Sequence, residues 1–65
     1  MEITVNGKSL ALESEMPLDR FLADRGLPEA SVVERNGEII QRDRRHLVTL
    51  REGDVLEIVR LVGGG

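Results

Sequence analysis

The first twelve residues alternate apolar and polar side chains on both sides of an Asn-Gly pair, and this pattern limits most strongly how the chain can fold. Residues 1–5 (MEITV) and residues 8–12 (KSLAL) each show the two-residue period of a half-buried strand. Asn6 and Gly7 between them form the strongest short hairpin signal, because both positions tolerate a positive φ. The sequence therefore predicts an antiparallel hairpin at the start of the chain.

The hydrophobic period changes after this hairpin. Leu18, Phe21 and Leu22 are spaced i, i+3 and i+4, which is the apolar stripe of an amphipathic helix. Pro17 suits the first helical position, where its missing N–H is no loss. We therefore predict a short helix over residues 17–25.

The residues that follow predict how this helix ends. Arg25 complements the negative end of the helix dipole. Gly26 suits the left-handed conformation that commonly follows a last helical turn, and Leu27 can make the apolar contact that accompanies it. Pro28 prevents the helix from continuing, so the chain must turn here.

The remainder of the chain is typical of short strands joined by tight turns. The predicted segments are, in order, a strand at 32–33, a turn at Asn36 and Gly37, a strand at 39–40, a polar connection at 41–46, a locally paired segment at 48–50, a turn at 51–54 and a last, longest strand at 55–62.

This order of elements predicts the fold class. One short helix cannot bury its apolar stripe alone, so it must lie across one face of the sheet. The predicted fold is therefore α+β, a ubiquitin-like β-grasp whose mixed four- to five-stranded sheet has the last strand parallel to the first at its centre. The expected core is Ile3, Val5, Leu10, Leu12, Leu18, Phe21, Leu22, Leu56 and Ile58. Val59 and Leu61 then point outward as two apolar side chains on a solvated face.

Composition excludes several classes of function. The net charge of −3 argues against broad nucleic-acid binding, and the single aromatic residue removes base-stacking platforms. The chain has no cysteine, so it has no disulfide and no thiolate site, which fits a reducing cytoplasm. We expect no membrane partner, since no apolar run is long enough to span a bilayer and the start lacks the pattern of a signal peptide.

No group of side chains has the pattern of a catalytic or metal site. The letters GKS at 7–9 lack the earlier glycine and the following helix of a phosphate-binding loop. His46 is the only histidine and is interpreted as a loop residue. The basic cluster at 42–46 and the acidic residues between 13 and 24 are interpreted as solvated surface.

The chain ends in three glycines, which leaves the α-carboxylate of Gly65 as the unusual chemical group. One interpretation is a frayed end beyond the folded part. The other is a domain over residues 1–62 followed by a flexible arm, Gly63, Gly64 and Gly65, that can thread a narrow channel because it has no Cβ atoms. Three residues reach at most about 10 Å.

Several stretches together resemble the ThiS family, the small sulfur carriers of thiamin biosynthesis. The matching stretches are ITVNG at 3–7, the short helix, ERNGEII at 34–40, EGD at 52–54 and EIVRLVGGG at 57–65. The resemblance covers essentially the whole chain.

The resemblance implies a function and a set of partners. A ThiF-type adenylating enzyme would use ATP and magnesium to convert the Gly65 carboxylate to an acyl-adenylate, and a persulfide sulfur would then displace AMP. The resulting thiocarboxylate would give its sulfur to thiazole synthase. Val59, Leu61 and Val62 would dock the body. The carrier itself would bind no cofactor and would not be an enzyme, and its sulfur would come from a cysteine desulfurase or a persulfide protein.

Three alternatives remain open at this point. The small subunit of molybdopterin synthase shares this fold and this Gly-Gly end, although it is usually longer. A ubiquitin-like modifier would instead join Gly65 to a lysine amine of a target. A plain β-grasp interaction module would use no carboxylate chemistry.

Overall fold

The computed structural model describes residues 1–61, and residues 62–65 lie outside the described part. In chain order, the strands are β1 (Glu2–Val5), β2 (Lys8–Ala11), β3 (Met16–Pro17), β4 (Val32–Arg35), β5 (Glu38–Ile39), β6 (Thr49–Leu50) and β7 (Val55–Val59). The helices are α1 (Leu18–Asp24), which follows β3, and the 3-10 helix η1 (Arg42–Leu47), which follows β5.

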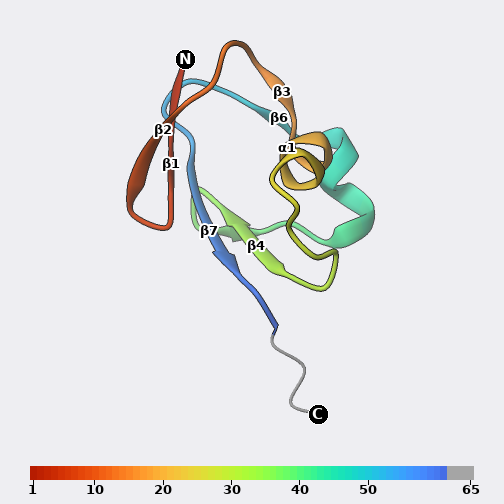
Figure 1. The fold of residues 1–65 in the computed structure, drawn as a ribbon. Coiled ribbons are helices and arrows are strands. Elements are labelled where there is room, and N and C mark those ends of the chain that lie inside the picture. Colours follow the sequence, from red (N-terminus) through yellow and green to blue (C-terminus); the bar gives the residue numbers. More distant parts are fainter. Residues whose placement is uncertain (62–65) are drawn as a thin grey trace.

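The main sheet has the strand order β2-β1-β7-β4-β5. β7 runs parallel to β1, with Thr4 opposite Val55, and antiparallel to β4. The predicted central position of the last strand is therefore confirmed, and α1 lies against one side of this sheet (Figure 1). Because β7 has a neighbour on each edge, it is held by both halves of the chain.

Both Asn-Gly pairs form the predicted turns. Asn6 and Gly7 have φ values of 51° and 81°, and Asn36 and Gly37 have 51° and 85°. Two successive residues with positive φ define the turn whose twist matches that of the flanking strands. Each hairpin register is thus set locally.

The helix begins one residue later than predicted. Pro17 is its N-cap, with an extended ψ of 144°, and it pairs with Thr49 in the small two-stranded sheet of β3 and β6. The prediction that residues 48–50 pair locally was therefore wrong. The backbone N–H of Leu18 donates to the carbonyl of Val48 at 2.8 Å, so this small sheet leads directly into α1.

The predicted way in which the helix ends is confirmed, although its last residue is Asp24 rather than Arg25, which is the C-cap. Gly26 has a φ of 67°, and its N–H donates to the carbonyl of Ala23. The N–H of Leu27 donates to the carbonyl of Leu22, which completes the pair of hydrogen bonds of a Schellman ending. Leu27 also packs against the core as a half-buried side chain.

The core lies between α1 and the sheet. Its buried apolar residues are Ile3, Leu18, Phe21, Leu22, Val33, Ile40, Leu50, Leu56 and Ile58. The predicted members Val5, Leu10 and Leu12 are only half-buried beside it. Val33, Ile40 and Leu50 were not predicted. Val33 and Leu50 come from strands of four and two residues, and Ile40 follows the two-residue strand β5, so none of these segments is long enough to show a clear period.

The segment predicted as a polar connection at 41–46 forms η1 instead. Arg45, one of the four basic residues interpreted as solvated surface, is only 6% exposed. Its guanidinium donates to the carbonyl oxygens of Glu29 and Ser31, at 3.2 and 2.6 Å, and so ties η1 to the chain before β4. Burial, reinforced by the neighbouring charge of Arg42, lowers the pKa of Arg45 from its usual value.

Asp54 organises the turn before β7. It is 6% exposed and accepts hydrogen bonds from the N–H of Arg51 at 2.9 Å, the Asn36 amide at 3.1 Å and the Arg35 guanidinium at 2.9 Å. Burial alone would raise the pKa of Asp54, but these donors and the charge of Arg35 together hold it below its ordinary value. This network explains why an acid follows Gly53, whose φ is 84°.

Candidate functional site

The end of β7 presents the apolar residues that the sequence placed on the outer face. Leu56 and Ile58 are buried, whereas Val59 and Leu61 are 58% and 59% exposed. The predicted exposure of both side chains is confirmed, and within β7 Val59 alternates with the buried Ile58 as predicted. The predicted length of the strand was wrong, because β7 ends at Val59 rather than at residue 62.

The last described residues lead away from the other elements (Figure 1). Val62 and the arm residues Gly63, Gly64 and Gly65 lie outside the described residues. Their predicted roles in docking and in carboxylate chemistry therefore stay predictions. The structure shows the base from which this segment starts.

The side chain of Asn6 fixes that base. Its amide oxygen accepts the N–H of Ile58 at 2.7 Å, and its amide nitrogen donates to the carbonyl of the same residue at 3.1 Å. The two bonds take the place of a further residue of β1, which turns away at this point. These two bonds hold the backbone of β7 in place at Ile58.

Replacing Asn6 with glycine should lower the free energy of unfolding by about 1–2 kcal/mol, the usual value of two partly exposed hydrogen bonds. Glycine accepts the positive φ without strain, so the turn should keep its backbone conformation while the side-chain bonds are lost. Chemical denaturation measures the loss, and hydrogen exchange should show a faster amide at Ile58. Asn6→Asp keeps the acceptor and should lose less. Equal stability of wild type and Asn6→Gly would contradict the assignment.

The exposed apolar surface of β7 continues onto β4. This continuation was not predicted from the sequence. Val32 lies directly opposite Val59 and is 37% exposed. The signal was present, because Val33 is apolar and buried and its neighbour must point the other way. The pairing itself depends on the register between distant strands, which no local pattern fixes.

A groove of about 350 Å³ lies on the other side of β7, where the described chain ends. Its lining residues are Val5, Asn6, Arg25, Leu27, Ile58 and Arg60. Arg25 lies over the ring of Phe21, with 5.8 Å between the guanidinium carbon and the ring centre. The base of the arm is therefore flanked by two arginines.

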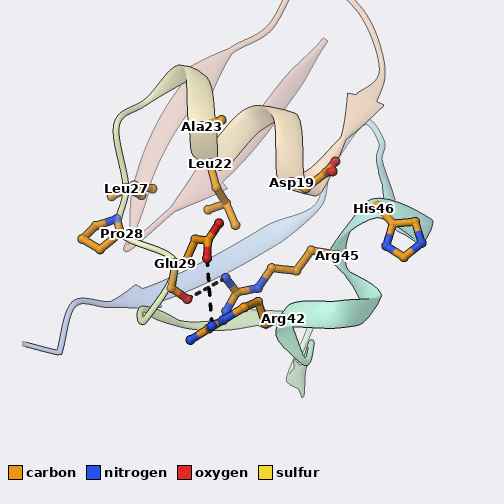
Figure 2. Close-up of a pocket in the computed structure, with 9 residues that line it drawn as sticks. All are labelled: Asp19, Leu22, Ala23, Leu27, Pro28, Glu29, Arg42, Arg45 and His46. Atoms are coloured by element: carbon orange, nitrogen blue, oxygen red, sulfur yellow. Dashed lines mark hydrogen bonds and ion pairs between the residues drawn. The ribbon is translucent and has the colours of Figure 1, made fainter.

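A second hollow, of about 280 Å³, lies between α1 and η1 (Figure 2). Arg42 and Arg45 extend toward Glu29, and an Arg42 nitrogen lies 3.9 Å from the Glu29 carboxylate. His46 is exposed at its margin. Among residues 1–61, the structure has no group of three or more residues that could hold a metal ion. We assign Arg45 a structural role here.

The comparison with protein families decides where the chain belongs. The ThiS family model matches residues 2–65. The chain belongs to the ThiS family. This ThiS-family chain is 59% identical to the sulfur carrier protein ThiS of Bacillus subtilis, over 97% of its own length and 98% of that protein.

Solved structures agree with the family assignment. The crystal structure of a thiamine biosynthesis protein (ThiS) from Geobacter metallireducens superposes on this ThiS-family chain with a TM-score of 0.84 and 30% sequence identity. The match covers the whole of both chains. The predicted β-grasp fold is therefore confirmed.

Two curated relatives are much longer proteins. Thiazole synthases of Paramagnetospirillum magneticum and Magnetococcus marinus are 35% and 36% identical to this ThiS-family chain over 66 residues. The match covers all of this chain but only 20% of each relative, so the chain spans about a fifth of their length. Within residues 1–61, no helix is long and apolar enough to cross a membrane.

Proposed function

We propose that this chain is a sulfur carrier of thiamin biosynthesis, whose Gly65 carboxyl group becomes a thiocarboxylate. The observation that supports this most strongly is the 59% identity to a sulfur carrier protein over nearly the full length of both chains. The chain would act as a protein co-substrate and not as an enzyme.

The chemistry follows from the poor reactivity of a carboxylate, which has a delocalised charge and no good leaving group. A ThiF-type adenylating enzyme, using ATP and magnesium, would convert the Gly65 carboxyl to an acyl-adenylate. A persulfide would displace AMP, and a thiol would then cleave the S–S bond and leave sulfur on Gly65. We place this chemistry in the cytoplasm, where thiol reductants are available.

The described residues support the presentation of such an arm. Val59 and Leu61 are exposed apolar side chains at its base, and with Val62 they would dock the body on a partner. Asn6 and Asp54 fix β7 at its two ends. Gly63–Gly65, which reach at most about 10 Å and have no Cβ atoms, would then enter a channel that the folded body cannot.

Thiazole synthase would be the sulfur acceptor. The support is that two proteins named thiazole synthase each contain a segment similar to this whole chain. A cysteine desulfurase or a persulfide protein would supply the sulfur. These similarities favour the thiamin route over the molybdopterin synthase and protein-modifier alternatives.

Intact mass spectrometry tests the proposal directly. After incubation with a ThiF-type enzyme, ATP and a sulfur donor, we expect one oxygen-to-sulfur exchange, confined to the C-terminal peptide. The same measurement shows whether the mature chain ends at Gly65, as the proposal requires. A reaction without ATP is the control. An unchanged mass in the presence of an activating enzyme that modifies another carrier would refute the proposal.

A further inference from the structure

Two asparagine side chains hold the two ends of β7. Asn6 and Asn36 each begin an Asn-Gly turn, and both have a φ of 51°. The amide oxygen of Asn36 accepts the N–H of Val55, the first residue of β7, at 2.9 Å. The amide oxygen of Asn6 accepts the N–H of Ile58, close to the other end of the strand, at 2.7 Å. The same residue type in the same kind of turn therefore serves opposite ends of one strand.

At the end nearer the arm, a side chain takes over where the backbone of β1 stops. β1 ends at Val5, which lies opposite Leu56, and the N–H of Asn6 donates to the carbonyl of Leu56 at 2.9 Å. β7 continues past the hairpin of β1 and β2 (Figure 1). Two residues beyond Leu56, the N–H and the carbonyl of Ile58 are both bonded to the Asn6 side chain. Asn6 thus extends the β1 edge of the ladder by one step.

Without the Asn6 side chain, the last part of β7 would be paired on one edge only. That remaining edge is the ladder with β4, which ends with Val59 opposite Val32. Local opening costs least where an element frays from the rest of the fold. The loss of two hydrogen bonds shifts such a local equilibrium by a factor of about 5–30 toward the frayed form. The base of the arm would then be ordered for only a minor part of the time.

Asn36 holds the other end of β7, where the strand keeps backbone partners on both edges without it. Val55 lies opposite Thr4 of β1, and the N–H of Asn36 itself donates to the Val55 carbonyl at 2.8 Å. Loss of the Asn36 side chain would therefore weaken the fold at a point away from the arm. The two asparagines differ in whether the base of the arm depends on them.

We propose that Asn6 is a positioning residue for the arm, which keeps the end of β7 ordered so that Gly65 is presented from a fixed base. The inference rests on the proposed function, and it applies to either enzyme that receives the arm, because the arm starts from the same base in both cases. Three glycines reach at most about 10 Å, so fraying of the base changes where the carboxyl group can lie. An enzyme that needs the ordered base binds the chain more weakly in proportion to the ordered fraction.

The test compares the same substitution at the two ends of β7. Asn6→Gly and Asn36→Gly both accept the positive φ, and both lose only side-chain hydrogen bonds. In sulfur loading by a ThiF-type enzyme, Asn6→Gly should raise the KM for the chain about fivefold with an unchanged kcat. Asn36→Gly should stay within about 1.5-fold of wild type in both constants. Asn36 also donates to Asp54 at 3.1 Å, so global stability alone would predict the larger effect in this control.

Two further measurements make the result decisive. Asn6→Asp, which keeps the acceptor for the Ile58 N–H, should give a KM between those of wild type and Asn6→Gly. Hydrogen exchange at the Ile58 amide should accelerate more in Asn6→Gly than in Asn36→Gly. An unchanged KM in Asn6→Gly, an equal rise in both glycine variants, or a higher KM without faster exchange would overturn the inference and leave the proposed function intact. A wild-type chain that takes up no sulfur would overturn the proposed function, and the inference with it.

Discussion

A chain extended by one alanine after Gly65 is expected to take up no sulfur from a ThiF-type enzyme, ATP and a sulfur donor. The added residue moves the carboxyl group by about 3.3–3.6 Å and places a methyl group in the proposed channel. The buried core lies between Ile3 and Ile58, so the unfolding temperature should not change. Intact mass spectrometry measures the uptake.

Removal of the alanine provides the matched control for this experiment. A carboxypeptidase that restores the end at Gly65 should also restore sulfur uptake, which separates the position of the carboxyl group from any damage to the protein. Adenylation of the extended chain without trimming would contradict the prediction, because it would show that the enzyme does not require the arm to end at Gly65.

Replacing Asp54 with alanine should lower the free energy of unfolding by about 3 kcal/mol, the second large effect that the structure predicts. The substitution leaves the Arg35 guanidinium, the Asn36 amide and the Arg51 N–H without their shared acceptor. Chemical denaturation measures the loss. Asp24→Ala is the control, because its pair with Arg20 is exposed and long, at 3.8 Å, and should change stability by less than about 0.5 kcal/mol.

The lowered pKa of Asp54 also predicts how the free energy of unfolding depends on pH. Its pKa is lower in the folded chain than the ordinary 3.8, so its contribution is fully present above that value. The contribution is lost as the pH falls below about 4, through the folded pKa. Asp54→Asn should therefore show a shallower loss of stability with acid than wild type. Identical acid titrations of the two proteins would contradict this role.

The elements that were predicted correctly have signals contained within a few consecutive residues. Asn6 with Gly7, and Asn36 with Gly37, fix two hairpins through dihedral angles alone. Gly26 ends the helix for the same reason. Once these elements are placed, the burial of one helix stripe leaves few arrangements, and the central position of β7 follows.

The elements that were missed depend on contacts between distant residues. β3 was not predicted, and β6, whose segment was predicted to pair locally, pairs with β3 instead. Each has two residues and exists because it pairs with the other. The segment of η1 was predicted to be a solvated connection because its residues are polar. Arg45 is nevertheless buried, and its guanidinium donates to backbone carbonyl oxygens of the segment before β4. A guanidinium that binds backbone leaves no periodic signal in the sequence.

The candidate site was predicted in part. The outward direction of Val59 follows from alternation along β7, whereas Leu61 lies beyond the end of that strand and is exposed beside the exposed Arg60. Their neighbour Val32 could not be predicted, because it joins the face only through the register between β4 and β7. The side-chain hydrogen bonds of Asn6 to Ile58 were not predicted, for a different reason. The hairpin turn was already a sufficient reason for an asparagine at this position, so no second role was sought.

The double anchoring of β7 has a mechanical consequence. A partner that pulls on the arm applies its force along β7, which is bonded to β1 on one edge and β4 on the other. Such a force shears the two ladders, so their hydrogen bonds must yield together rather than one after another. Under the proposed function, the chain would therefore enter and leave a narrow channel of its partner without unfolding from the end of β7.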